Sequence, residues 1–251
     1  MWRLKMRHDL TCSSTALEED PEAARLAGRS GSPSLEQMSP ALDDLSLRFA
    51  VYTRNARFGA LDIGCGDGRA TAAALDRGGH VLAIDPDRAA LHQLLARVPP
   101  EQCRRLQVRV GALPELDFKF ARFSAVHAAR VLHLLPPPAL QQSLSKFFRW
   151  LYPAGRLFVS TLAPGGAHWD FAARELARRR MAQEQWPGYI EDLRRLLPGW
   201  RAAIRSVHLL DEPVLRRELE VAGFVVEYVN HYSLPWDSEQ PCCAIIARCA
   251  V

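Results

Sequence analysis

The feature that most constrains this chain is a short apolar segment running into a turn with glycine at every second position. Residues 60–71 read Ala-Leu-Asp-Ile-Gly-Cys-Gly-Asp-Gly-Arg-Ala-Thr. Glycine tolerates positive φ and has no Cβ, so this turn lets backbone approach a nucleoside-like ligand closely. A second apolar segment ends in Asp85, whose carboxylate suits a pair of ribose hydroxyls. The pattern predicts a strand, a glycine turn and a helix around a nucleotide-like site.

Apolar segments of strand length alternate with helical patterns along most of the chain. We predict strands over 58–63, 80–85, 106–110, 123–129, 156–162, 224–231 and 243–249, and helices over 69–77, 87–97, 138–151 and 212–222. Strands separated by helices of this length indicate a parallel sheet covered on both faces. The prediction is an α/β, Rossmann-like doubly wound fold. Its seven-stranded sheet is mostly parallel, with an antiparallel C-terminal hairpin strand and a helical insertion after strand five.

Two segments differ in composition from this alternating pattern, one before it and one within it. Residues 1–38 are rich in Ser, Glu, Arg, Gly and Pro without periodicity, so we predict a flexible N-terminal extension and a folded domain over 39–251. A capped helix with Asp43 and Asp44 in its first turn is expected to begin that domain. Residues 163–206 interrupt the alternation with Gly and Pro turns and a charged helix.

Length, charge and cysteine content exclude several classes of protein. A chain of 251 residues that is 48% hydrophobic buries a full core, and it lacks the run of about eighteen apolar residues that a membrane span requires. A net charge of +4 is too small to indicate a nucleic-acid binder by itself. The six cysteines form no C-x-x-C pair, so buried free thiols and a cytoplasmic location are expected.

Two common nucleotide motifs do not fit the glycine turn. A dinucleotide fingerprint requires G-x-G-x-x-G, but Arg69 occupies the place of its third glycine. A phosphate-binding P-loop requires Gly-Lys-Ser/Thr, which is absent. Asp62, two residues before Gly64, is unfavourable beside a pyrophosphate and useful beside a cation.

The segment 62–68 followed by Ile84-Asp85 resembles the first signature of class I S-adenosylmethionine-dependent methyltransferases. The resemblance continues through residues 131–135 after the fourth strand and 151–157 before the fifth, so it covers 58–162 in order. It implies S-adenosyl-L-methionine as cofactor. The residues that it implies as cofactor contacts are Asp62, Gly64, Cys65 and Gly66 at the methionine end, Asp85 at the ribose, Pro86, Ala112 and Leu113 near adenine, and Ala129 and Arg130 beside the methionine.

One element of the family pattern is missing. Most relatives carry an acid after the third strand that binds the adenine amino group, whereas this chain has Ala112 there. Asp117, or backbone groups of Ala112 and Leu113, are the alternatives that the sequence offers.

Methyl transfer is an in-line displacement, so the attacking atom, the methyl group and the leaving sulfur must be aligned. A base is needed only where the attacking atom carries a proton. His133 is our candidate base because it follows the fourth strand, on the cofactor side of such a sheet. A loop residue bonded to backbone is the alternative for His133. His127, within that strand, is expected to be structural. No metal is expected.

The insertion is the candidate substrate lid, since segments placed after strand five often cover the substrate in this family. His168, Trp169, Trp186 and Tyr189 are its candidate substrate contacts, although the aromatic residues also suit a small core. Its many arginines indicate either a solvated helix face or recognition of an anionic or carrier-bound substrate.

We therefore expect a methyltransferase acting on a small or medium-sized, partly apolar metabolite, with transfer to oxygen. No Asn/Asp-Pro-Pro-Tyr/Phe motif follows the fourth strand, which disfavours transfer to base or amide nitrogen, and carbon remains open. The alternatives are methylation of RNA or of a carrier-protein-bound intermediate, and a non-catalytic cofactor-binding scaffold. Nucleic acid is the less favoured partner, and a homodimer is open.

Overall fold

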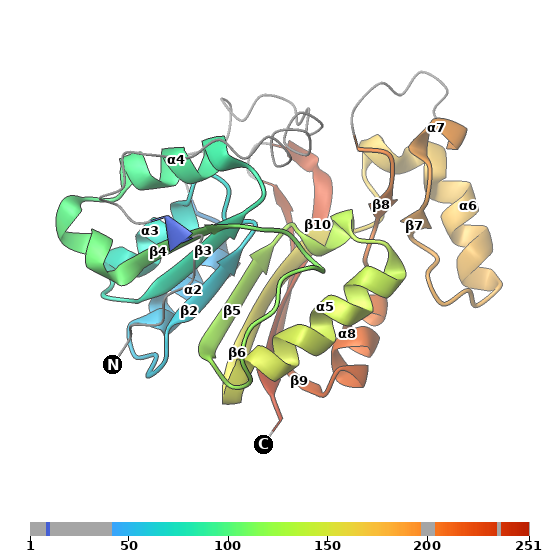
Figure 1. Ribbon diagram of the computed structural model, residues 1–251. Coiled ribbons are helices and arrows are strands. Elements are labelled where there is room, and N and C mark those ends of the chain that lie inside the picture. Colours follow the sequence, from blue (N-terminus) through green and yellow to red (C-terminus); the bar gives the residue numbers. More distant parts are fainter. Residues whose placement is uncertain (1–8, 11–41, 197–203, 235–236, 251) are drawn as a thin grey trace.

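The computed structural model describes residues 9–10, 42–196, 204–234 and 237–250, and shows one eight-stranded sheet (Figure 1). The strands, in spatial order, are β1 Asp9–Leu10, β4 Leu106–Val110, β3 Val81–Asp85, β2 Ala60–Ile63, β5 Phe123–Ala129, β6 Leu151–Leu162, β10 Asp237–Cys249 and β9 Phe224–Leu234. From β4 to β6 neighbouring strands are parallel, whereas β10 is antiparallel to both its neighbours. The predicted seven-stranded Rossmann-like sheet is confirmed.

The short strand β1 adds an eighth, antiparallel member at the β4 edge. Asp9 and Leu10 are the only described residues of the predicted extension 1–38, whose remainder lies outside the described part of the chain. The division at residue 38 stays a prediction.

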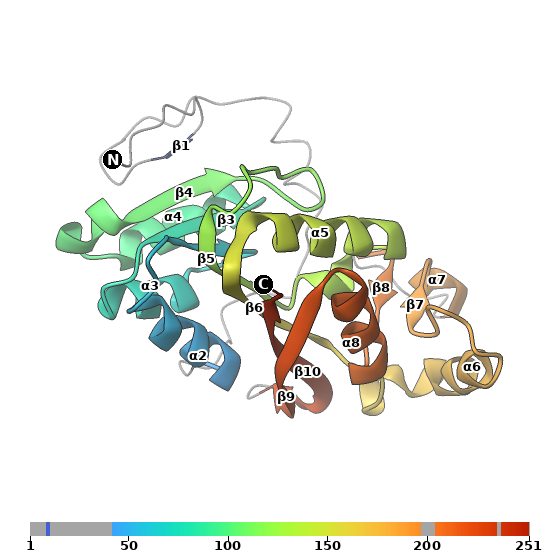
Figure 2. The same ribbon diagram turned by 90° about the horizontal axis from the view of Figure 1, so that it is seen from below.

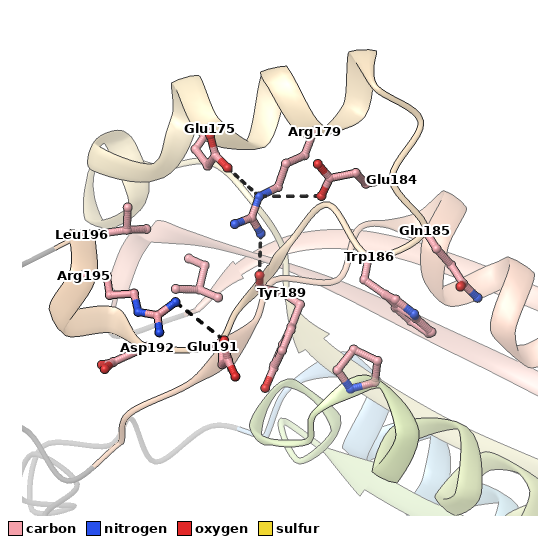
Figure 3. A pocket seen from close by; sticks show the side chains of 12 residues that line it. Glu175, Arg179, Glu184, Gln185, Trp186, Tyr189, Glu191, Asp192, Arg195 and Leu196 are labelled. Atoms are coloured by element: carbon pink, nitrogen blue, oxygen red, sulfur yellow. Dashed lines mark hydrogen bonds and ion pairs between the residues drawn. The ribbon is translucent and has the colours of Figure 1, made fainter.

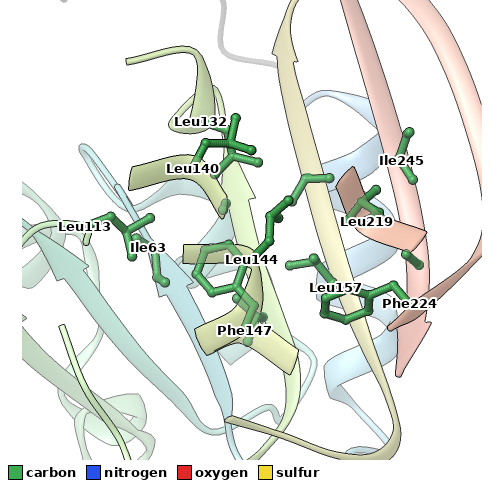
Figure 4. Close-up of a cluster of buried hydrophobic side chains, with 14 of the residues drawn as sticks. Ile63, Leu113, Leu132, Leu140, Leu144, Phe147, Leu157, Leu219, Phe224 and Ile245 are labelled. Atoms are coloured by element: carbon green, nitrogen blue, oxygen red, sulfur yellow. The ribbon is translucent and has the colours of Figure 1, made fainter. Parts of the chain in front are cut away.

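Helices cover both faces of the sheet, because successive strand side chains point to opposite faces. One face packs against α2 Asp44–Thr53, α3 Arg69–Asp76 and α4 Arg88–Arg97, and the other against α5 Pro137–Trp150 and α8 Glu212–Val221 (Figure 2). In β2, for example, Leu61 and Ile63 face the α5 side and Ala60 faces the α3 side. Figure 4 shows the α5 side, where Leu144 and Phe147 pack between Ile63 and Leu157.

The strand predicted over 156–162 begins earlier, at Leu151 of β6. Leu151 pairs with Phe123, and the next pair is Arg156 with Ala125, so the residues between are looped out of the ladder as a bulge. Ala154, within this bulge, has a left-handed backbone conformation with φ 62°. A Pro and a Gly therefore mark a strand irregularity here and not the end of a strand.

The insertion is a small unit at one end of the molecule (Figure 1). It contains η4 Ala167–Trp169, α6 Asp170–Met181, β7 Tyr189–Ile190 and α7 Leu193–Leu196, and β7 pairs with β8 Val207–His208. Its core is made of Ala172, Leu176, Ile190, Leu193, Val207 and Leu209. Two bonds fasten it to the sheet: Leu210 N donates to Leu162 O (2.9 Å), and Trp169 Nε1 donates to Gln240 Oε1 (2.7 Å). It is a packed substructure and not a loose loop.

Cys65, Cys242, Cys243 and Cys249 are buried free thiols, as expected. The same expectation is wrong for Cys103, which takes part in a disulfide. Cys103 lies in the short helix η2 Pro100–Arg105, where its side chain is partly exposed. Within the described residues, no helix is long and apolar enough to cross a membrane.

Candidate functional site

The glycine turn lies where β2 ends, at the edge of the sheet where the parallel strands β3 and β5 also end. Gly64 N and Cys65 N both donate to Ile84 O, at 2.8 and 3.1 Å, which ties the turn to the end of β3. Gly68 N donates to Cys65 O (3.0 Å), and Gly68 then caps α3 in the left-handed conformation. These bonds hold the turn before any ligand is bound.

The three turn glycines, all at positive φ, are needed for different reasons. A Cβ at Gly64 would lie 2.5 Å from a Val131 methyl, and one at Gly68 would lie 2.2 Å from a Leu94 methyl. A Cβ at Gly66, at φ 54°, meets no atom within 4 Å. Gly64 and Gly68 therefore permit internal packing, whereas Gly66 presents bare backbone to open space, as a ligand cradle requires.

Asp85, 8% exposed at the end of β3, faces the turn. Its Oδ2 accepts from Gly66 N (2.9 Å) and its Oδ1 accepts from Asp87 N (2.8 Å). Burial raises the pKa of this carboxyl, while the two backbone amides oppose that rise. Each oxygen keeps a second lone pair, so the carboxylate is oriented and able to accept two more hydrogen bonds.

Asp62 is more deeply buried, at 1% exposure, and both its oxygens have protein partners. Thr71 Oγ1 donates to Oδ2 (2.6 Å), and His127 Nδ1 lies 2.7 Å from Oδ1. His127 is the β5 residue paired with Asp62, and its Nε2 reaches Ser46 Oγ of α2 at 3.2 Å. His127 is structural, as expected. Asp62 joins β2, α3, β5 and α2 into one network beneath the turn.

Arg130 follows Ala129 at the end of β5 and has φ 55°. Its Nη1 lies 3.1 Å from Oδ2 of Asp43, whose Oδ1 accepts from Ser46 N and caps α2. Burial acts to raise the pKa of Asp43, but the Ser46 amide and the Arg130 charge outweigh it and lower that pKa. Arg130 therefore fixes the start of α2 beside the turn.

The residues expected near adenine are spread over two loops. Pro86 is exposed beyond β3, Ala112 is exposed after β4, and Leu113 is buried in the core. Asp117 lies at the opposite end of the sheet, because it accepts from Trp150 Nε1 (3.4 Å) at the last residue of α5. The alternative that Asp117 replaces the missing acid is wrong.

His133 lies in η3 Leu132–Leu134, directly after β5. It is 9% exposed, and its Nδ1 has no hydrogen-bond partner among the described residues. Burial, with smaller contributions from Arg130 and His208, lowers the pKa of His133 to about 3. The ring is therefore neutral near pH 7.

No motif marks His208, a second buried histidine whose pKa is lowered as that of His133 is. His208 of β8 is 1% exposed, neither ring nitrogen has a partner within the described residues, and burial lowers its pKa to about 4. A Leu135 backbone group lies close to the ring and opposes this lowering of the pKa. The strand β8 packs against η3, which brings the buried neutral imidazole of His208 close to that of His133.

The predicted lid residues separate into different environments. Trp186 and Tyr189 contact the His208 ring, with centroids 5.1 and 5.4 Å away. Trp169 is bound to Gln240 and packs in the insertion core, so its position is structural. The side chain of His168 lies outside the described part of the structure.

The arginines of the insertion are largely paired with carboxylates. Ion pairs join Arg178 and Arg179 to Glu175 (both 2.8 Å), Arg180 to Asp211 (2.7 Å), Arg194 to Asp192 (3.1 Å) and Arg195 to Glu191 (3.8 Å). Hydrogen bonds from Arg178 and Arg179 lower the pKa of Glu175 to about 2. This compensation favours the interpretation of a solvated, charged surface over an anion site.

A cavity of about 560 Å³ lies between α5 and the insertion (Figure 3). Its lining includes Pro137, Trp186 and Tyr189 together with acidic and basic residues of α6 and α7. The glycine turn and Asp85 do not line it. Trp186 and Tyr189 therefore contact His208 and also line this cavity. Within the described residues no cluster of His, Cys, Asp and Glu is arranged to hold a metal ion.

Residues 60–155 match the family model described as a methyltransferase domain. An uncharacterized methyltransferase of Synechocystis is 34% identical over 95 residues, which is 38% of this chain and 42% of that protein. The chain thus spans less than half the length of this curated relative.

Solved structures extend the similarity of fold to most of the chain. A SAM-dependent methyltransferase of Methanosarcina mazei matches with a TM-score of 0.60 and 20% identity, covering 77% of this chain and 93% of the other. A Burkholderia thailandensis 1,6-didemethyltoxoflavin-N1-methyltransferase matches with a TM-score of 0.55 and 22% identity, covering 95% and 94%. Residues 60–155 therefore match a methyltransferase domain, in agreement with the resemblance seen in the sequence, and the solved structures support the predicted fold.

Proposed function

We propose that this protein binds S-adenosyl-L-methionine and transfers its methyl group to an oxygen of a small, partly apolar molecule. The observation that carries the proposal is the pairing of Asp85 with Gly66. The carboxylate is oriented by the turn's own amide, and bare glycine backbone stands beside it. Bound there, S-adenosylmethionine supplies an electrophilic methyl group on a positively charged sulfur. The residues present fit such a cofactor, since Asp85 has free lone pairs for ribose hydroxyls.

The protein's contribution on the acceptor side is to hold a proton-bearing nucleophile in a dry environment. His133 follows Val131, whose methyl group abuts Gly64, so η3 connects the cofactor turn to the acceptor side. A neutral imidazole there accepts a hydrogen bond from the nucleophile. We keep His133 as the residue that takes the acceptor's proton, and we assign Asp62 to positioning of the turn. The compensated arginines favour an uncharged small molecule over RNA or an acidic carrier. The Burkholderia enzyme of similar fold is named an N1-methyltransferase, so the fold does not by itself select oxygen.

Calorimetry with S-adenosylhomocysteine and with its 2′-deoxyribose analogue tests the cofactor assignment. We expect wild type to prefer the ribose form by about tenfold or more, and Asp85→Asn to lose that preference, since a bidentate hydroxyl contact needs both oxygens. Asp76→Asn, at an exposed carboxylate on α3, is the matched control and should behave as wild type. Absence of binding by wild type, or an undiminished preference in Asp85→Asn, contradicts the assignment.

A further inference from the structure

Three loops meet at the edge of the sheet where the parallel strands begin, opposite the edge that carries the glycine turn (Figure 1). They are residues 54–59 before β2, residues 117–122 before β5, and residues 149–153 where α5 passes into β6. Phe58 N donates to Ser124 Oγ (2.9 Å), which joins the first loop to β5. Arg122 N donates to Trp150 O (2.8 Å), which joins the second loop to the third. The three loops therefore form one continuous surface.

Aromatic side chains lie exposed on this surface. Phe120 is 72% exposed, although its neighbours Phe118 and Phe123 are buried in the core. Tyr152 is also exposed, and its ring stacks on that of Phe58 with centroids 4.1 Å apart. An aromatic ring in water forgoes the free energy that its burial would provide. Exposed aromatic side chains that gather on one surface indicate a contact site for another molecule.

The same three loops carry an excess of positive charge. Their basic residues are Arg54, Arg57, Lys119, Arg122 and Arg149, and their acidic residue is Asp117. Arg149 lies 4.0 Å from Asp117, and both side chains are largely exposed. An exposed pair at this distance compensates little of the charge in water. The surface therefore favours a partner with negative charge and disfavours a cationic one.

The stacked ring pair favours one kind of anion over another. Single-stranded nucleic acid binds aromatic side chains by stacking its bases on their free faces. Phe58 already has the Tyr152 ring stacked on it, and the Arg57 guanidinium lies over the ring, 5.4 Å from the centroid. Phe120 is then a single apolar anchor among cations, which fits an apolar side chain flanked by carboxylates. These contacts favour an acidic protein segment over RNA.

We propose that this edge of the sheet binds an acidic segment of a partner protein. An apolar side chain of the segment packs against Phe120, and the carboxylates of the segment lie among the positive charges of the three loops. The surface lies at the opposite end of the strands from Asp85 and the glycine turn, so a bound partner leaves the proposed cofactor site open. The inference is thus independent of the proposed function.

Fluorescence anisotropy with a labelled synthetic peptide, in which glutamates surround one phenylalanine, tests the proposal on the full chain. We expect this peptide to bind at least about fivefold more tightly than the same peptide with serine in place of phenylalanine, and to bind more weakly as salt is added. Phe120→Ser and Lys119→Glu should each lower the affinity at least about fivefold. Two controls should leave it unchanged: Val221→Ser, at an apolar side chain of matched exposure (75%) on α8, and Arg174→Glu, at an exposed arginine on α6.

Three outcomes overturn the proposal. The first is absence of peptide binding by wild type, or equal binding of the two peptides. The second is wild-type affinity in a Phe120→Ser variant whose circular dichroism shows that it is folded. The third is tighter binding of oligouridylate than of the acidic peptide, lost in Lys119→Glu, which would assign the surface to RNA.

Discussion

The proposed donor side, at the glycine turn, and the proposed acceptor side, around His133 and His208, differ in how their buried polar groups are held. At the glycine turn, Asp62 and Asp85 each have two protein partners, which orient the carboxylates without a ligand. On the acceptor side, His133 and His208 have nitrogens that no described residue pairs with. The carboxylates at the turn are therefore oriented by protein groups, whereas the two imidazoles are held mainly by packing.

The two sides also differ in where their residues come from. The donor side is built from consecutive loops of the parallel sheet, whose strand ends meet at one edge. The acceptor side joins η3 of the sheet domain to β8, which closes the insertion. A constant donor site on the sheet and a variable acceptor site on an insertion allow one fold to serve many substrates.

The largest effect is expected at Asp62. Asp62→Ala removes the partner of both Thr71 and His127 in a fully buried network, and should lower the free energy of unfolding by about 4 kcal/mol. Urea denaturation measures this loss. Asp67→Ala, which removes partly exposed ion pairs to Arg69 and Arg97, is the control and should cost within about 1 kcal/mol. Equal losses in the two variants would mean that the Asp62 network is no more important than a surface pair.

Acidification should lower the free energy of unfolding through protonation of His208. The pKa of His208 is lowered to about 4 in the folded protein, against an ordinary value near 6.5. The unfolded chain therefore binds more protons between those values, and stability falls as pH drops from 6.5 towards 4, by about 3 kcal/mol for this residue. Urea midpoints between pH 7 and pH 5 should fall less steeply in His208→Phe than in wild type. An identical slope in both would show that His208 titrates normally.

The turn glycines distinguish packing from ligand approach. Gly68→Ala places a Cβ against Leu94 at a positive φ, and should destabilise the protein by about 3 kcal/mol. Gly66→Ala meets no atom and should cost only about 1 kcal/mol of backbone strain, while lowering affinity for S-adenosylhomocysteine at least about tenfold. Denaturation and calorimetry on both variants measure the two effects. Normal ligand affinity in Gly66→Ala would place the cofactor elsewhere.

The smallest effect is expected on the charged surface of the insertion. Arg178 is exposed and paired with Glu175, so Arg178→Ala should leave both the urea midpoint and the affinity for S-adenosylhomocysteine unchanged within error. A marked loss of that affinity would indicate that the charged surface of the insertion contributes to ligand binding.

The sequence was sufficient for the sheet because its signals are local. Strands over 106–110 and 123–129 begin and end as predicted, since apolar runs and their flanking turns determine where a strand can lie. The glycine turn was equally clear, because positive φ and close backbone approach restrict residue type at Gly64, Gly66 and Gly68. The cap of α2 by Asp43 also follows from a local preference.

Tertiary structure alone decided the partners of side chains distant in the sequence. Asp117 was brought to Trp150 and away from the ligand edge, and Arg130 was brought to Asp43. His208 lies in a strand of two residues with no periodic signal, and only the β7–β8 pairing places it beside η3. Periodicity and motifs report the conformation of neighbouring residues, whereas the pairing of buried polar groups depends on which segments the fold brings together. The sequence therefore determined the glycine turn and the strand that leads into it, and the tertiary structure decided which distant side chains meet around that turn.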